Sequence, residues 1–397
     1  MQQQNWKRRA RRRAVAFVIA TCAAALPVFE AVAGDVNAND VLTYAGVARV
    51  GDFAQPQGGR LADQVFTDEV ILSLDHAVRT ALAQQPTGLV IETDKLAELQ
   101  PGRPAYALAL GLVDVEVLKE RIGEEDKRTY RVDARVLVFD FREMAVVYQR
   151  PVLLEFIDVG RSADDVTTLQ AVAQGRRTDG LAAGFMAALG RALLPSHRRC
   201  TFQVGAASAG NDGVMAAFTG GDPDRVRRLP NQLADGFQDY MAAEAGLSFV
   251  PSRLDQLVGG AMASRFADGR VYTFAIPDPD YAVSLALVDT RKVEAVSRPG
   301  YRTLVYGVYL DVKIAEPLSG AVLFEDRLKQ GAPKVAPASQ AVVDDREAYA
   351  ETLRLLLQDF ASQVRTPDEA WMTAHATRNP QEASRQLKSL RDRCATT

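Results

Sequence analysis

The sequence carries one pattern twice. Residues Tyr106–Asp114 (YALALGLVD) match Tyr281–Asp289 (YAVSLALVD) at an offset of 175 residues. Further matches keep the same order: Tyr44–Ala48 with Phe202–Ala206 and Gly88–Ile91 with Gly246–Phe249, both at an offset of 158, and Ala145–Val146 with Ala321–Val322 at an offset of 176. Ordered self-similarity of this kind indicates a repeated structural unit. We therefore expect two tandem copies of one fold, with an insertion in the second copy between residues 257 and 281.

Each copy shows the same succession of expected elements. Apolar spacing predicts a strand, a helix, a short strand, a three-stranded meander and a closing helix. In the first copy these fall at residues 41–53, 68–85, 89–92, 105–157 and 181–193. The polar segments 159–177 and 331–345, which precede the closing helices, are expected to be loops. The predicted fold class is α/β, of the α+β type, with a mixed sheet and two helices on one face in each copy.

The repeat and its flanking segments divide the chain into four parts. We expect a signal peptide at residues 1–33, a first α/β repeat at 34–198, a second at 199–367 and a C-terminal helical tail at 368–397. Pro195 and Pro367 mark the expected ends of the two closing helices, because proline cannot continue a helix from within.

The N-terminal segment has the features of an export signal. Six basic residues between Lys7 and Arg13 precede the apolar run Ala14–Leu26 and the small-residue pattern Ala31–Ala33. This order is typical of a cleavable secretory signal, and the run is shorter than the roughly 20 residues that span a bilayer. We expect cleavage after Ala33 and a periplasmic protein. The alternative is an outer-membrane lipoprotein acylated at Cys22, because residues 19–22 resemble a lipoprotein box, with Thr21 where a smaller residue is usual.

The net charge of the exported chain excludes one class of partner. Residues 1–33 contain six basic residues and one acidic residue, so the remainder has 41 Lys and Arg against 49 Asp and Glu, a net charge of −8. No basic stripe interleaved with aromatic residues occurs. An acidic chain without such a stripe is not suited to phosphate backbones, so we expect no nucleic-acid partner.

Two cysteines remain after the leader, Cys200 and Cys394. Thiols in an oxidising compartment are expected to pair. We predict a disulfide between them, which would tie the C-terminus to the junction between the copies. Two separately buried thiols are the alternative.

The succession of elements resembles a group of envelope modules. In both copies a helix ending in glycine is followed by a short apolar strand, a Leu-x-x-Leu half-turn and a Tyr-Ala-x-x-Leu-x-Leu-Val strand that opens the meander. This resembles the TolB amino-terminal, curli-secretion lipoprotein and penicillin-binding-protein-activator type, over residues 44–194 and 202–365. The resemblance implies a periplasmic scaffold or regulator, in many cases lipidated, without a catalytic signature.

Catalytic and metal-binding motifs are sparse in this sequence. His76, His197 and His375 have no second His or Cys at ligand spacing, so we expect no metal site and no cofactor. Asp114 and Glu116 share the outward face of a strand and form a candidate carboxylate pair for glycoside chemistry. The second copy has Asp289 and Arg291 at these places, which favours a solvated sheet face. Three weaker candidates are interpreted as structural: Ser208 in a partial nucleophile elbow, Asp222 with Asp224, and Asp278 with Asp280.

The sequence therefore favours a non-catalytic interaction or scaffold protein of the bacterial cell envelope, periplasmic or associated with the outer membrane. A small-molecule or glycan-binding protein with a cleft between the repeats is the alternative, and an envelope hydrolase using Asp, Glu or Ser chemistry is a third hypothesis. The expected partner is an envelope protein. Its identity and the oligomeric state do not follow from the sequence.

Overall fold

A computed structural model gives the architecture of the chain. It describes residues 41–50, 60–84, 90–93, 106–122, 125–140, 143–160, 164–189, 200–252, 261–266, 271–337, 340 and 343–394. The predicted signal peptide, Cys22 and His197 lie outside the described residues. Within the described part of the chain, no helix is both long and apolar enough to cross a membrane.

The first copy consists of five strands and four helices among its described residues. In chain order they are β1 (Val41–Val50), α1 (Leu61–Val65), α2 (Asp68–Gln84), β2 (Val90–Glu92), β3 (Tyr106–Ile122), β4 (Glu125–Asp140), β5 (Ala145–Gly160), α3 (Asp165–Ala173) and α4 (Gly180–Leu189). The predicted loop 159–177 is wrong over α3, whose N-cap Asp164 accepts a hydrogen bond from the Val166 N–H. Gly184 in α4 lies so close to β5 that an added Cβ would meet Val152 Cγ1 at 2.6 Å.

The second copy repeats this order. It contains β6 (Thr201–Ala209), α5 (Asp212–Thr219), α6 (Pro223–Glu244), β7 (Ser248–Phe249), β10 (Tyr281–Arg298), β11 (Tyr301–Ala315), β12 (Val322–Pro337) and α7 (Asp345–Arg365). The inserted segment supplies the hairpin β8 (Ala261–Phe266) and β9 (Val271–Ala275). The predicted loop 331–345 is wrong over residues 331–337, which pair with β11 as part of β12.

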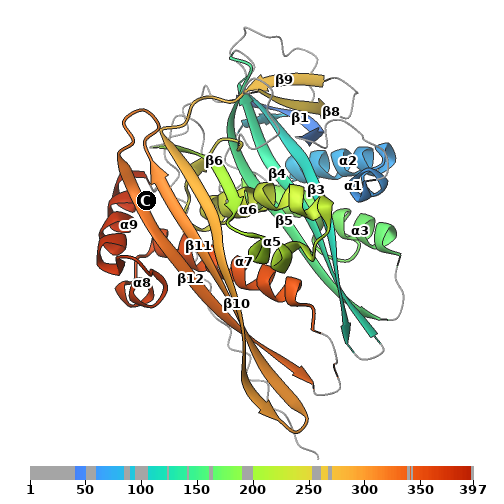
Figure 1. Ribbon diagram of the computed structural model, residues 1–397. Coiled ribbons are helices and arrows are strands. Elements are labelled where there is room, and N and C mark those ends of the chain that lie inside the picture. Colours follow the sequence, from blue (N-terminus) through green and yellow to red (C-terminus); the bar gives the residue numbers. More distant parts are fainter. Residues whose placement is uncertain are drawn as a thin grey trace, which may run out of the picture. The chain divides into compact units, whose positions relative to one another are not determined.

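All these strands join one mixed sheet (Figure 1). Its order is β12-β11-β10-β6-β7-β5-β4-β3-β1-β8-β9, with β2 also on β1. In each copy the opening strand runs parallel to the first strand of an antiparallel meander. The predicted mixed α/β class is confirmed.

Three irregularities of the sheet recur in both copies. Each opening strand has a bulge, at Ala45 in β1 and at Gly205 in β6. The first strand of each meander has a second bulge, at Val113 in β3 and at Val288 in β10. The third strand of each meander has another, at Val147 in β5 and at Leu323 in β12. Leu42 pairs with Tyr106 as Phe202 pairs with Tyr281, so the opening strands correspond at an offset of 160 and not 158. Because bulges bend strands at defined places, their recurrence supports a duplicated fold.

A buried tyrosine holds the start of the helix that follows the meander in each copy, α3 in the first and α7 in the second. The Tyr130 hydroxyl on β4 donates to Asp165 Oδ1 at 3.0 Å, and the Tyr306 hydroxyl on β11 donates to Asp345 Oδ1 at 2.7 Å. Both carboxylates lie in the first turn of the following helix, where negative charge is favourable. Burial raises the pKa of both tyrosines, and the adjacent carboxylate adds to this.

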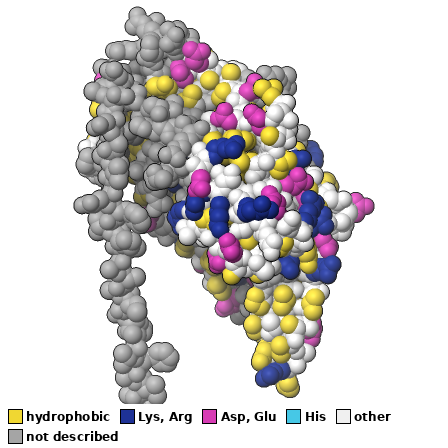
Figure 2. Space-filling view, turned by 90° about the vertical axis from the view of Figure 1, so that its left-hand side faces the viewer, with side chains coloured by type: hydrophobic (Ala, Val, Ile, Leu, Met, Phe, Trp, Pro, Cys, Tyr) yellow, Lys and Arg dark blue, Asp and Glu magenta, His cyan; other side chains and the backbone are white. Residues whose placement is uncertain are grey.

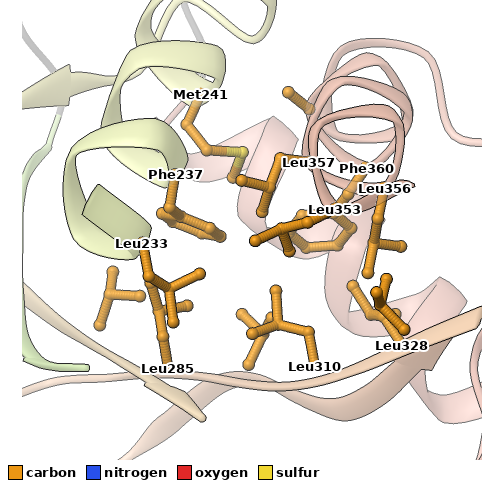
Figure 3. Packing of buried hydrophobic residues seen from close by; sticks show 14 of the residues in the cluster. Leu233, Phe237, Met241, Leu285, Leu310, Leu328, Leu353, Leu356, Leu357 and Phe360 are labelled. Atoms are coloured by element: carbon orange, nitrogen blue, oxygen red, sulfur yellow. The ribbon is translucent and has the colours of Figure 1, made fainter. Parts of the chain in front are cut away.

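The helices of the second copy pack on its own sheet through a large apolar cluster. In Figure 3, Leu233, Phe237 and Met241 of α6 face side chains of α7, with strand residues beneath them. The labelled partners are Leu353, Leu356, Leu357 and Phe360 of α7 and Leu285, Leu310 and Leu328 of the strands. All ten are buried, and such burial is the main stabilising term of the fold.

The C-terminal tail forms α8 (Glu369–His375) and α9 (Pro380–Cys394). Met372, Leu387 and Leu390 belong to the same apolar cluster as α7. Cys394 at the end of α9 forms a disulfide with Cys200, with the Cα atoms 5.2 Å apart. The structure thus contains the bond that the cysteine count suggests.

The second copy also covers the other face of the first copy's sheet. The hairpin β8–β9 pairs with β1 and touches β5, and Phe274 of β9 stacks on Phe139 of β4 with ring centroids 4.1 Å apart. Farther along the same strands, α6 contacts β5: the Gln149 side-chain amide donates to Gln238 Oε1 at 2.9 Å. The face of the first copy's sheet that alternation predicts to be solvated is therefore partly covered.

Candidate functional site

A row of charged side chains crosses the face of the first meander that α6 covers. Arg131 on β4 lies between two acidic neighbours, 3.4 Å from Glu116 on β3 and 3.0 Å from Glu155 on β5. Arg354 of α7 reaches the same Glu155 carboxylate at 2.9 Å. These pairs join three strands of the first copy to a helix of the second.

Two aspartates lie directly opposite each other in this row. Asp133 on β4 pairs in register with Asp114 on β3, an arrangement that like charges disfavour. Burial raises the pKa of Asp133 to about 7, and Asp114 and Glu116 add to this. Burial also raises the pKa of Asp114. The hydrogen bond from the Val115 N–H and the charge of Arg228 lower this pKa, but by less than burial raises it. At neutral pH Asp133 is therefore only partly ionised.

Helix α6 brings further charges from the second copy. Arg135 on β4 lies 2.6 Å from Asp235 and 3.9 Å from Asp239. Asp239 is 7% exposed, and burial raises its pKa to about 8 despite the attraction of Arg135. Arg135 stays charged and makes its short contact with Asp235. Because the contact with Asp239 is longer, Asp239 is the less well compensated of the two carboxyls.

Between these groups lies a cavity of about 350 Å³, whose walls come from both copies. The polar walls hold Asp114, Glu116, Arg131, Asp133, Glu155, Arg225, Gln232, Asp235, Asp239, Arg346 and Arg354, and the apolar walls include Leu118, Leu153, Leu154, Phe218, Leu229, Leu233, Tyr240, Leu353 and Leu357. Small-molecule sites combine apolar walls with convergent polar groups, and this cavity has both. Gly236 of α6 also lines the cavity, and an added Cβ there would meet Leu357 Cδ1 at an ordinary 3.5 Å.

Of the candidate residues that the sequence suggested, only some lie at the cavity. It brings Asp114 and Glu116 to the cavity wall, but it ties each to an arginine, Arg228 at 3.8 Å and Arg131 at 3.4 Å. His76 is exposed on α2 and His375 stacks on Trp371, with ring centroids 4.3 Å apart.

Ser208 and Asp280 are not among the residues that line the cavity, whereas Asp222 lies 3.5 Å from Arg225 on its wall. Ser208 is exposed on β6, and the helix that follows, α5, is capped by Asn211. Asp280 accepts hydrogen bonds from the backbone and hydroxyl of Thr201. Among the described residues no group of three or more His, Cys, Asp or Glu side chains is arranged to hold a metal ion.

The sequence interpretation missed Asp133, Asp235 and Asp239. Asp133 stands in a strand whose alternation predicts an outward, solvated side chain, and the two α6 aspartates lie on the polar stripe of an amphipathic helix. The signal that could have revealed Asp133 is the register of the meander, which sets this residue opposite Asp114.

A second feature is the exposed end of the other meander. β10 is exposed along its last eight residues, and apolar side chains there and on the neighbouring strands face solvent: Val293, Val296, Tyr301 and Val335. Figure 2 shows hydrophobic side chains gathered at the lower end of the molecule, where β10 and β11 turn. Exposed apolar residues that cluster in this way are typical of interaction surfaces.

Comparisons with known proteins give weak similarities. No family model matches the sequence, and no curated protein matches it. Among solved structures, a dodecamer of a PelC variant from Paraburkholderia phytofirmans is similar with a TM-score of 0.22 and 10% identity, over 43% of this chain and 90% of that chain. A minor lipoprotein from Acinetobacter baumannii is similar with a TM-score of 0.20 and 9% identity, over 45% of this chain and 97% of that chain. Similarity at this level identifies neither a family nor a function.

Proposed function

We propose that this chain is a non-catalytic binding protein of the bacterial cell envelope, and that it holds a small molecule in the cavity between its two copies. The observation that carries the proposal is the cavity of about 350 Å³, walled by the meander of one copy and by the helices of the other. Its volume lies within the range of small-ligand sites, roughly 300–1,000 Å³.

The duplication supports this proposal. A single copy leaves the charged face of its meander open to water, where it gives little selectivity. Helices α5, α6 and α7 of the second copy lie between the two meanders in Figure 1, and they turn that face into one wall of a partly open site. The ion pair between Glu155 and Arg354 ties the two walls together.

The absence of catalysis is part of the proposal. Glycoside hydrolysis needs one carboxylic acid and one free carboxylate flanking the substrate. In the pair that the sequence singles out, Glu116 lies 3.4 Å from Arg131 and Asp114 lies 3.8 Å from Arg228, and these ion pairs favour a structural role for both carboxylates.

The test is to identify small molecules that co-purify with the mature, disulfide-bonded chain from its own envelope, by mass spectrometry of the gently released fraction. The matched variants are Ala350→Phe, on the cavity wall, and Glu351→Phe, one residue farther along α7 and exposed. We expect a compound that the Ala350→Phe variant loses and the Glu351→Phe variant keeps. A folded wild type that carries no compound, or one that both variants retain equally, would contradict the proposal.

A second candidate function is an interaction or scaffold protein with an envelope protein partner. The exposed apolar residues at the end of β10–β12 favour it, because such a surface suits docking. Cross-linking in cells from a cross-linker placed at residue 296 tests this second function. A single captured protein that is lost in the variants Val293→Ser and Val335→Ser would support an interaction role. An unchanged cross-linking pattern in these variants would contradict it.

A further inference from the structure

We propose that the ligand of this cavity carries a cationic group, an ammonium or guanidinium, on an apolar body. This inference rests on the proposed function and names the ligand class of that same site. It is drawn from the placement of Asp133 and Asp239 among side chains whose charges are otherwise matched.

Each arginine on the cavity wall already has a carboxylate. Arg131 and Arg354 share Glu116 and Glu155, while Arg225 lies 3.5 Å from Asp222 and Arg346 lies 3.2 Å from Asp344. Arg135, beside the cavity, is matched by Asp235 at 2.6 Å.

Two carboxyls are left over. Among the described side chains Asp133 has no cation within ion-pair distance, and its in-register neighbour is another aspartate. Asp239 has only the longer 3.9 Å contact with an arginine that is already paired. The groups that face these two are Asp114 and Glu116 on β3, Arg131 and Arg135 on β4, Glu155 on β5, Arg225, Arg228 and Asp235 on α6, and Arg346 and Arg354 on α7.

An uncompensated carboxyl that is withdrawn from water tends to keep its proton unless a positive charge replaces it. Without a ligand, burial and the neighbouring acids hold the pKa of Asp133 at about 7 and that of Asp239 at about 8. A bound cation takes the place of these protons, so its affinity rises as the pH passes through this range. The apolar walls Leu153, Leu229 and Leu353 then surround the rest of the ligand.

Three probes with one apolar body separate the charge from the cavity. They are 4-phenylbutylammonium, 4-phenylbutanol and 4-phenylbutanoate, titrated calorimetrically into the disulfide-bonded chain at pH 6 and pH 8.5. We expect the ammonium to bind about tenfold more tightly than the alcohol at pH 8.5, as for one partly screened charge pair. That preference falls in Asp133→Asn and in Asp239→Asn, and it persists in the exposed control Glu351→Gln.

The outcomes also separate this inference from the proposed function. Tightest binding of the carboxylate would assign the site to an anion and would overturn the inference. An anion could accept from the cavity-wall arginines, because Arg131, Arg225, Arg346 and Arg354 each have a buried N–H without an acceptor. Equal binding of ammonium and alcohol, lost in Ala350→Phe, also overturns the inference and leaves the proposed function standing. If no probe binds and no compound co-purifies, both fail. Circular dichroism establishes that each variant is folded, and the two aspartate variants test the inference independently.

Discussion

The protonated Asp133 predicts an unusual dependence of stability on pH. The unfolded chain releases the proton of this side chain near its ordinary pKa of 3.8, whereas the folded chain keeps it until about pH 7. Between these values the folded state binds more protons, so the free energy of unfolding falls as the pH rises. The contribution of Asp133 is full below pH 3.8 and is lost as the pH rises through 7, opposite to the usual behaviour of an aspartate.

The size of the effect follows from the two pKa values. A rise from 3.8 to about 7 corresponds to about 4 kcal/mol, at about 1.36 kcal/mol for each tenfold change in proton affinity. Asparagine has nearly the same shape and does not titrate. We therefore expect the stability of Asp133→Asn relative to the wild type to improve by up to about 4 kcal/mol between pH 4 and pH 8.

Urea unfolding followed by far-ultraviolet circular dichroism, at unit steps from pH 4 to pH 8, measures this difference. Glu351→Gln, at an exposed position of α7, is the control and should follow the wild type at every pH. A stability difference between Asp133→Asn and wild type that stays constant over this range would refute the reasoning, because it would mean that Asp133 is ionised and solvated in the folded chain.

Other substitutions test the packing and the cross-links by the same unfolding measurement. Gly236→Ala should stabilise the chain by about 0.5–1 kcal/mol through helix propensity. Gly184→Ala should destabilise it, because the added Cβ would meet β5 at 2.6 Å. Stabilisation by both substitutions would contradict the close packing of α4 on β5. Replacing Cys200 and Cys394 by alanine should cost at most about 5 kcal/mol under oxidising conditions and nothing after reduction. Tyr306→Phe should cost about 1 kcal/mol through the lost hydrogen bond at the start of α7, and an unchanged midpoint would show that this bond contributes nothing.

The sequence predicted the elements whose signals are local. The two meanders and the long helices follow from apolar spacing, which reflects the backbone period of a strand or a helix. The interpretation failed where a local signal is ambiguous. The polar and small residues of segment 331–345 suggested a loop, yet residues 331–337 belong to β12. Pro333 and Pro337 are tolerated there because β12 lies at the end of the sheet order, where a missing N–H costs little.

The candidate site was predicted only in part. Asp114 and Glu116 were singled out because they share one strand face, and both lie on the cavity wall. Asp133 and Asp239 were not, because each taken alone fits a solvated strand or helix face. Only the approach of α6 to β4 turns those solvated faces into the walls of one shared site.

By itself, the sequence determined that one arrangement of strands and helices is written twice, because each copy must bury its own apolar side chains and that need is visible in the spacing. The tertiary structure alone decided how the second copy's helices lie on the first copy's sheet. The physical reason is that burial and charge compensation belong to pairs of surfaces. No single segment reveals whether an aspartate will face water or another aspartate.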